Sequence, residues 1–300
     1  MKENTIEIDD LRLPNIFDKK LANGMNISLV EYGNLPLVNI QFIINIGSLS
    51  EIKSEQQWLT SFLANYLKEG SKRYNGTNII DLFASYGGSI DISSSDDNLF
   101  INAEVLSKFA TNAIQIIADI LRNPIFPIQE QRRIKDDLLR NLDLLQVDPQ
   151  SLTSARLNYL IFQDHPYGRE FPQKNNVKKF SHSILKSFYK NAIDSTKTKV
   201  YVIGNFDINQ IDNQLENSFG DWEFGNGNAV KRPKLMQQNT WSLIDREEAH
   251  QSTIKLAMRL NNFSIDDYPR LIMINALLGG TFISRITTNI REDKGYSYSP

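Results

Sequence analysis

Residues 37–70 read LVNIQFIINIGSLSEIKSEQQWLTSFLANYLKEG and contain the clearest secondary-structure pattern in the chain. The first part, residues 37–46, is apolar and β-branched on both faces, which is typical of a central, buried strand. Gly47 ends this run. Over residues 55–69 the apolar side chains recur at helical spacing, and Gly70 follows where a helix C-cap glycine belongs. A buried strand followed by an amphipathic helix predicts an α+β fold.

Similar patterns continue along the chain. Hairpins are predicted at Asn23-Gly24, between residues 17–21 and 25–32, and at residues 95–97, between 89–93 and 99–105. Helices are predicted over residues 77–86, 107–121, 128–147, 149–162, 182–191 and 207–219, and a strand over 199–203. Residues 225–238 are rich in Gly, Asn, Lys and Pro and lack periodicity, so a domain boundary is expected there.

Beyond this boundary the pattern of the opening stretch returns. A strand is predicted over residues 253–260, a helix over 266–278 that ends at Gly279-Gly280, a further helix over 282–291, and extended chain over 296–299. Strand, helix and glycine in this order hint at an internal repeat. The second copy is much shorter than the first, so the chain is expected to end inside a domain.

Composition limits the classes of protein that fit. Hydrophobic residues make up 41% of the 300 residues, which suffices for one large or two ordinary domains. The formal net charge is −2 with no basic run, so a nucleic-acid or anionic-membrane partner has little support. The absence of cysteine excludes disulfides, thiolate metal sites and a cysteine nucleophile. No signal peptide is visible, and no apolar run approaches the roughly 20 residues that span a bilayer, so the compartment stays open between cytoplasm and periplasm.

Five pieces of the sequence, by their order and spacing, resemble one half of an inverzincin peptidase, the pitrilysin- and insulinase-like family M16. They are residues 35–51, with the core strand, the Gly-Ser turn and Glu51; residues 164–169, DHPYGR, similar to the family's His-Pro-Tyr-Gly loop; residues 200–222, which resemble the end of the first domain; and residues 278–285 and 291–298, which resemble the glycine-rich and Arg/Tyr regions of the second. The resemblance covers roughly residues 16–300.

The resemblance implies a specific architecture. Tandem homologous α+β domains are expected, each an antiparallel sheet covered by helices, as in the mitochondrial processing peptidase. The first would cover residues 1–228, and residues 229–300 would be the N-terminal part of a truncated second domain. In the family, two such halves close around a chamber for unfolded peptide, either fused or as separate subunits.

Active members of the family carry His-x-x-Glu-His on the helix that corresponds to residues 55–69. Two histidines at i and i+4 can grip one zinc ion, while the glutamate acts as general base on the bound water. A glutamate on a later helix completes the protein ligands. Alignment on the helix end gives Ser61, Ala64 and Asn65 at the three motif positions and Asn141 near the distal one. None of these offers an imidazole or a carboxylate.

No other residues replace the missing ligands. The acids nearest to Asn141, Asp137 and Asp143, do not obviously substitute for the distal glutamate. The three histidines, His165, His182 and His250, lie beyond helical reach of one another and are interpreted as loop, cap or solvated residues. No Gly-x-Ser-x-Gly elbow is present. The chain is therefore expected to hold no metal and to have no catalytic residue of its own.

Arg291 and Tyr298 have the spacing of a family pair that lies in the half opposite the zinc. There the pair binds the substrate backbone near the scissile bond and helps to stabilise the oxyanion, a role that suits a guanidinium and a phenol as fixed donors. From the residues alone, Arg291 could instead pair with Glu292 or Asp293 on a helix face, and Tyr298 could pack on a sheet. Tyr296 is a competing candidate, but it lacks the family spacing.

The leading hypothesis is a non-catalytic, substrate-binding subunit of a heterodimeric zinc metallopeptidase that degrades or processes peptides. A partner subunit with His-x-x-Glu-His would bring the zinc and the glutamate base, and unfolded peptide would be the substrate. The alternative is a structural or assembly subunit, similar to the family's respiratory-complex core subunits, with no role in proteolysis. An active enzyme with an unrecognised site is the third possibility.

Overall fold

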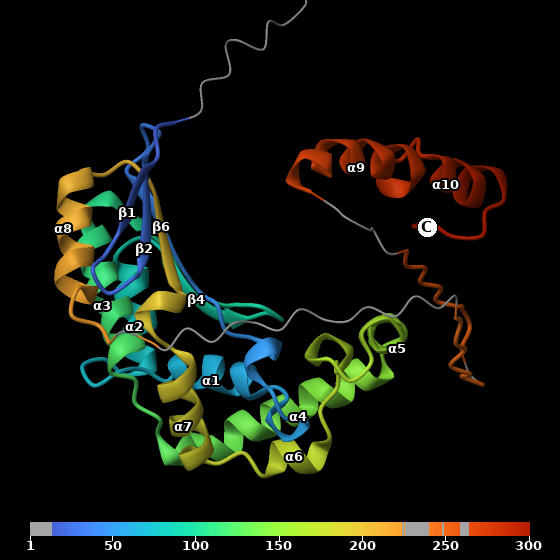
Figure 1. Ribbon diagram of the computed structural model, residues 1–300, viewed down its shortest axis with the longest axis horizontal. Helices are drawn as coiled ribbons and strands as arrows, with labels where there is room; N and C mark the ends of the chain where they lie inside the picture. Colours follow the sequence, from blue (N-terminus) through green and yellow to red (C-terminus); the bar gives the residue numbers. More distant parts are fainter. Residues whose placement is uncertain (1–13, 224, 226–239, 248, 259–263) are drawn as a thin grey trace, which may run out of the picture. The chain divides into compact units, whose positions relative to one another are not determined.

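The computed structural model describes residues 14–223, 225, 240–247, 249–258 and 264–300 (Figure 1). Contacts divide the chain into two compact units, residues 1–255 and 256–300. The expected domain boundary between residues 228 and 229 lies outside the described residues and stays a prediction.

The first unit is built on a six-stranded sheet. Its strands are β1 (Phe17–Lys20), β2 (Asn26–Glu31), β3 (Leu37–Ile44), β4 (Ser89–Ser94), β5 (Leu99–Leu106) and β6 (Thr198–Gly204). Their spatial order is β1-β2-β6-β3-β5-β4. The expected antiparallel pairing holds for every neighbouring pair except β2 and β6, which run parallel, so the sheet is mixed. Parallel pairing needs a long crossover, and here the intervening strands and helices provide it.

The α+β class is confirmed by the helices, most of which lie within a few residues of their expected positions. They are α1 (Leu59–Leu67), α2 (Gly76–Ser85), α3 (Ala110–Arg122), α4 (Gln131–Val147), α5 (Pro149–Phe162), α6 (Lys174–Lys178), α7 (His182–Ala192) and α8 (Ile208–Phe219). Only the short α6 was not expected. Local chemistry sets their ends: the Asp148 carboxylate accepts the N–H of Ser151 at 2.7 Å and caps α5, with Pro149 in the first turn. Gly70, after α1, adopts a φ of +115° that favours glycine.

One face of the sheet carries the hydrophobic core. Along β3, Val38, Ile40 and Phe42 are buried, whereas Asn39 and Gln41 point to the other face. Helix α3 packs on β3 and β5, α8 packs on α3, and α1 and α2 pack on β4 (Figure 1). Burial of apolar surface contributes about 25 cal/mol per Å² and is the main stabilising term. The start of α1 is therefore held against the core by the side chains that line its buried face.

The second unit consists of short helices. They are α9 (Tyr268–Asn275), a π-helix (Ala276–Gly280), α10 (Arg285–Thr287) and a second π-helix (Thr288–Asp293). These broadly match the two helices expected over residues 266–278 and 282–291. In the described part of this unit no hydrophobic side chain is buried; the buried ones are Ser284 and Thr287, whose hydroxyls lie 2.9 Å apart. The described part of this unit thus has helices but no apolar core.

The expected strand over residues 253–260 is wrong in the part that the structure describes. Residues 253–258 make no strand pairing, although Ile254, Leu256 and Met258 alternate as a strand would and are exposed. A strand needs a neighbour to satisfy its backbone N–H and C=O groups, and none is present for this segment among the described residues. Residues 296–299, expected to be extended, also form no strand.

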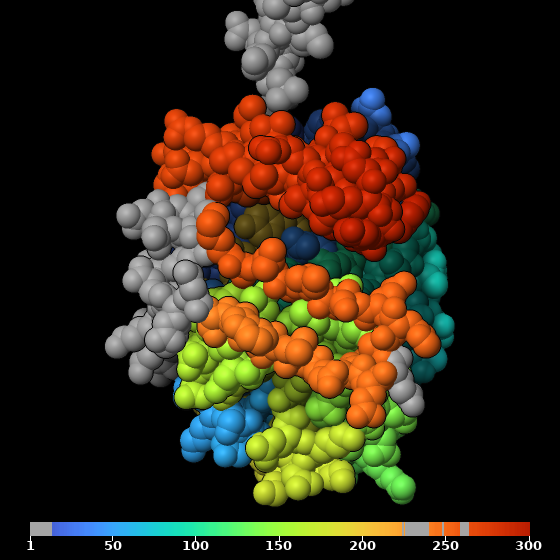
Figure 2. All heavy atoms as spheres, turned by 90° about the vertical axis from the view of Figure 1, so that its right-hand side faces the viewer, coloured from blue at the N-terminus to red at the C-terminus, as the bar shows by residue number. Residues whose placement is uncertain are grey.

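Residues 240–247 and 249–255 follow the surface of the first unit. Figure 2 shows them as an extended orange strip beside α5. The Arg156 side chain donates to the Ser242 hydroxyl at 2.7 Å, and the Arg246 side chain donates to the Val147 carbonyl at 2.8 Å. These polar contacts attach the strip to the end of α4 and the middle of α5, while Trp241 and Leu243 stay exposed.

Residues Ile265–Asp293 are long and apolar enough to cross a membrane by length and composition, with a mean hydropathy of 1.3 over an 18-residue stretch. The segment is not one continuous helix, because residues 281–284 break it and the Ser284 hydroxyl caps a new helix there. A spanning segment needs continuous backbone hydrogen bonding in lipid. The break therefore favours an apolar helix pair over a membrane span.

Candidate functional site

The three motif positions lie on α1, as the sequence predicts. Ser61 and Asn65 are half-buried and Ala64 is buried. The Ser61 hydroxyl lies 3.0 Å from that of Ser94 on β4, and the Asn65 side chain donates to the Ser61 carbonyl at 2.9 Å. The polar groups that stand in place of zinc ligands are therefore partnered within the chain itself.

The distal position gives no ligand either. Asn141 is exposed on α4, a helix that packs against α1. Asp137 pairs with Arg133 at 3.2 Å and with Arg140, and Asp143 pairs with Lys174. In the part of the chain that the structure describes, no group of three or more His, Asp or Glu side chains could hold a metal ion. The residues present do not fit the zinc ion of an active family member.

The three histidines occupy structural positions. The His165 Nδ1 accepts the N–H of Tyr167 at 3.3 Å in the loop after α5. His182 begins α7, with its ring edge against Phe126. His250 is exposed in a bend. These surroundings agree with the interpretation as loop, cap and solvated residues.

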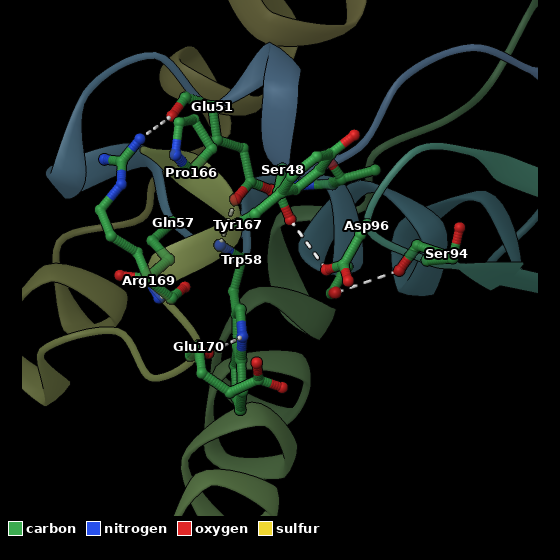
Figure 3. A pocket seen from close by; sticks show the side chains of 13 residues that line it. Ser48, Glu51, Gln57, Trp58, Ser94, Asp96, Pro166, Tyr167, Arg169 and Glu170 are labelled. Carbon is green, nitrogen blue, oxygen red and sulfur yellow. Dashed lines mark hydrogen bonds between the residues drawn. The ribbon is translucent and has the colours of Figure 1, made fainter. Parts of the chain in front are cut away.

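A hollow of about 290 Å³ opens at the start of α1 (Figure 3). Four segments line it: the turn at Ser48, the connection that leads from Glu51 to Ser61, the β4–β5 turn and residues 166–170. Two of the pieces that resemble the family, residues 35–51 and 164–169, meet here although more than a hundred positions separate them. The hollow therefore lies beside the first motif position, Ser61.

Glu51 is the buried charge of this site. Its side chain is 5% exposed, and its two oxygens accept the backbone N–H groups of Trp58 and Thr60, both at 2.8 Å. A carboxylate at a helix N-terminus satisfies donors that the helix cannot and complements its dipole. Burial nevertheless raises the pKa of Glu51 to about 6, and the two N–H bonds offset this only in part. The pKa of Glu51 therefore lies above the usual value of a glutamate.

Arg169 ties the loop after α5 to the same connection. Its guanidinium donates to the carbonyls of Glu51 and Ile52 at 3.2 and 3.4 Å, and its own carbonyl accepts the Gln57 side chain (Figure 3). The Trp58 indole N–H donates to the Glu170 carbonyl at 3.2 Å. These bonds join two segments that are far apart in the sequence.

Tyr167 closes the hollow on another side. Its hydroxyl donates to Asp97 in the β4–β5 turn. Burial and the bond to Asp97 raise the pKa of Tyr167, so its hydroxyl stays a donor at any physiological pH. Neither Ser61 nor Ser94 is hydrogen-bonded to a histidine or a carboxylate among the described residues. The hollow can thus receive a polar group, but it lacks the nucleophile–base pair that hydrolysis requires.

Arg291 and Tyr298 come together in the second unit. The Arg291 guanidinium carbon lies 4.2 Å from the ring centroid of Tyr298 and 4.6 Å from that of Phe282. Its Nε also lies 3.2 Å from a carboxylate oxygen of Glu292, so the surface ion pair considered from the residues is present as well. Tyr298 is 79% exposed, and Tyr296 has no recorded contact with the guanidinium in the described part of this unit. The pair with the family spacing is also the pair that stacks.

The cluster of Glu51, Trp58 and Arg169 was not predicted. Glu51 and Arg169 were noted only as parts of two separate pieces, and their contact joins residues 118 positions apart. Trp58 has a φ of +71°, which no sequence pattern indicates for a tryptophan. The sequence pointed to Glu51 only as part of the first piece that resembles the family.

Comparison with known proteins gives matches along nearly the whole chain. Residues 30–173 match the family model described as insulinase (peptidase family M16), and residues 179–300 match the model described as peptidase M16 inactive domain. An uncharacterized zinc protease of Rickettsia felis is 24% identical over 93% of this chain and 68% of its own length. A non-peptidase homolog of Helicobacter pylori is 23% identical over 84% of this chain and 58% of its own.

A solved structure supports the fold. The peptidase M16 inactive domain from Pseudomonas fluorescens superimposes with a TM-score of 0.79 at 19% identity, over 95% of this chain and 69% of that one. At this identity the likeness concerns the fold alone.

Proposed function

Because the chain belongs to the M16 peptidase family, we propose that it is the non-catalytic, substrate-binding subunit of a heterodimeric zinc metallopeptidase. A partner subunit with His-x-x-Glu-His would supply the zinc and the general base. This chain would supply part of the chamber wall together with Arg291 and Tyr298, and unfolded peptide would be the substrate. One contrast carries the proposal: the motif positions hold no ligand, whereas Arg291 and Tyr298 keep the family spacing and stack on each other.

The chemistry of the pair suits this role. A guanidinium and a phenolic hydroxyl are donors that remain protonated at neutral pH, so both can meet the negative charge that develops on a peptide carbonyl oxygen. Stacking on Tyr298 and Phe282 limits the directions in which the Arg291 guanidinium can point. A donor fixed in advance stabilises a transition state more than a mobile one does.

The test is reconstitution with a zinc-bearing M16 subunit from the same genome. Cleavage of a quenched fluorescent peptide that lacks structure would be followed for each subunit alone and for the mixture. Activity is expected only in the mixture, and Arg291→Ala is expected to lower kcat about 100- to 1000-fold, as for loss of an oxyanion donor. Arg285→Ala removes an exposed arginine from the same unit and serves as the matched control.

Two results would contradict the proposal. Unchanged cleavage in the mixture that contains Arg291→Ala would remove the substrate role of this side chain. A stable complex of the two subunits without peptidase activity would favour the structural or assembly subunit instead.

A further inference from the structure

Glu51 and Asp119 are the two acids of the first unit that are buried without an ion pair among the described residues. Glu51 forms no ion pair among the described residues. The backbone N–H groups of Trp58 and Thr60 donate to its carboxylate, and the charge of Arg169 lowers its pKa. The guanidinium of Arg169 bonds to the carbonyl of Glu51 rather than to its carboxylate. Burial of an unpaired carboxylate is costly, so this side chain gains free energy by reaching water when it is ionised.

The connection that carries Glu51 has exposed turns, and bonds to Arg169 and Glu170 hold it to the loop after α5. It joins β3 to α1 through two short 3-10 turns, Ser48–Ser50 and Ser54–Gln56, in which no residue is buried. Trp58, at its end, has a left-handed backbone conformation, which costs a bulky residue on the order of 1–3 kcal/mol. The hydrogen bond from the Trp58 N–H to Glu51 compensates part of the energetic cost of this conformation. Release of that bond allows Trp58 to relax.

We propose that Glu51 makes this connection a pH-sensitive latch: a protonated Glu51 keeps it closed at the edge of the hollow, and an ionised Glu51 lets it open. The hollow gives the carboxylate a route to water, because Glu51, Trp58 and Thr60 all line it. Opening would move the carboxylate out of its buried position and change access to Ser61. The latch acts in the isolated chain, whether or not a partner subunit exists.

The direction of the switch follows from proton linkage. In the closed state the pKa of Glu51 is about 6, whereas in water a glutamate has its usual pKa of 4.5. The state with the higher pKa binds the proton more tightly, so acid favours the closed state. The closed-to-open ratio therefore falls by up to about 30-fold as pH rises from below 4.5 to above 6.

The other charged groups at the hollow come from two segments. Asp96 in the β4–β5 turn and Glu170 after the Tyr167 loop are negative, and Arg169 is positive. The positive charge of Arg169 lowers the pKa of Glu51 and partly opposes the effect of burial. The start of α1 contributes Thr60 and Ser61, which carry no charge, so the proton on Glu51 is the variable charge of the latch.

Hydrogen–deuterium exchange tests the latch in the intact chain. Protection factors of the backbone amides in residues 51–62, corrected for the intrinsic effect of pH, are expected to fall about eightfold between pH 5 and pH 7.5. Glu51→Gln, which cannot ionise, should show protection that does not change with pH. Glu55→Gln alters an exposed acid of the same connection and should behave as the wild type. Amides of β3 provide the reference for global unfolding.

Two outcomes would overturn the latch: protection in the wild type that is independent of pH, or a pH effect that persists in Glu51→Gln. If Glu51→Gln does not fold, side-chain carboxyl ¹³C shifts of the wild type decide the matter. The Glu51 signal is then expected to titrate near pH 6 together with the backbone signals of Trp58. Titration at the value of an exposed glutamate, or without any change at Trp58, would contradict the latch.

Discussion

The polar side chains at the start of α1 and those of the Arg291–Tyr298 pair have different surroundings. At α1, Ser61 and Asn65 are hydrogen-bonded within the chain, and the neighbouring Phe62 lies fully in the core. In the second unit, Arg291 stacks on exposed rings, and no hydrophobic side chain of the described part is buried.

The difference separates a site that is packed into its unit from one that is exposed. The motif positions have become part of the packing of α1, so changes there should act first on stability. Arg291 and Tyr298 contribute little to the stability of their own unit, because an exposed cation–π contact is worth about 0.5–1 kcal/mol. Changes there should act first on binding.

The largest expected effect, on the free energy of unfolding, tests this contrast directly. Phe62→Ala should lower the free energy of unfolding by about 3–5 kcal/mol, since it removes a fully buried ring from the core. Leu277→Ala in the second unit should change it by less than about 0.5 kcal/mol, since that side chain is largely exposed. Urea unfolding followed by circular dichroism measures both. Equal decreases in the free energy of unfolding would show that the second unit is packed as firmly as the first.

The next effect concerns the metal. Ser61→His, Asn65→His and Asn141→Glu, combined in one chain, should place three zinc ligands on two packed helices. After dialysis against a weak chelator, elemental analysis should find no zinc in the wild type and about one zinc per chain in the variant. Zinc at 100 times its Kd should then stabilise the variant by about 2.7 kcal/mol. Ser61→His alone, which lacks the partner at i+4, is the control.

Zinc in the wild type would overturn this prediction. A stoichiometric amount would mean that the alignment of the motif positions is wrong. His165, His182 and His250 would then have to be considered again as ligands.

The smallest effects compare the two polar pairs. Ser94→Ala leaves Ser61 without its hydroxyl partner and should cost about 0.5–1.5 kcal/mol in unfolding free energy. Tyr298→Phe keeps the ring under Arg291 and should leave stability unchanged. Thermal unfolding of the two variants side by side measures the difference. A larger loss of stability in Tyr298→Phe than in Ser94→Ala would contradict the contrast between the two sites.

Much of the fold follows from local sequence. Asn23-Gly24 predicts the β1–β2 hairpin, and Gly24 indeed has a positive φ of 85°. Asp148 and Pro149 predict the start of α5, and the positions expected for the lost zinc motif lie on α1. These features depend on neighbours along the chain, which the sequence displays directly.

Other features depend on contacts between distant residues. No local pattern places β6 beside β2, or Arg169 on the carbonyl of Glu51. The alternation of Ile254, Leu256 and Met258 is typical of a strand, but a strand also requires a partner, which alternation cannot supply. The sites that combine such contacts, such as the Glu51 cluster, are therefore visible only in three dimensions.

The central position of β6 has a consequence for synthesis on the ribosome. Until residue 204 has been made, β2 and β3 each have one edge without a partner strand. The sheet then exists at most as two separate parts, β1-β2 and β3-β5-β4. At 5–20 residues per second this interval lasts about 8–30 s after β3 is complete. Bare strand edges pair readily with other chains. The nascent protein is therefore expected to depend on a chaperone that shields these two edges until β6 joins them.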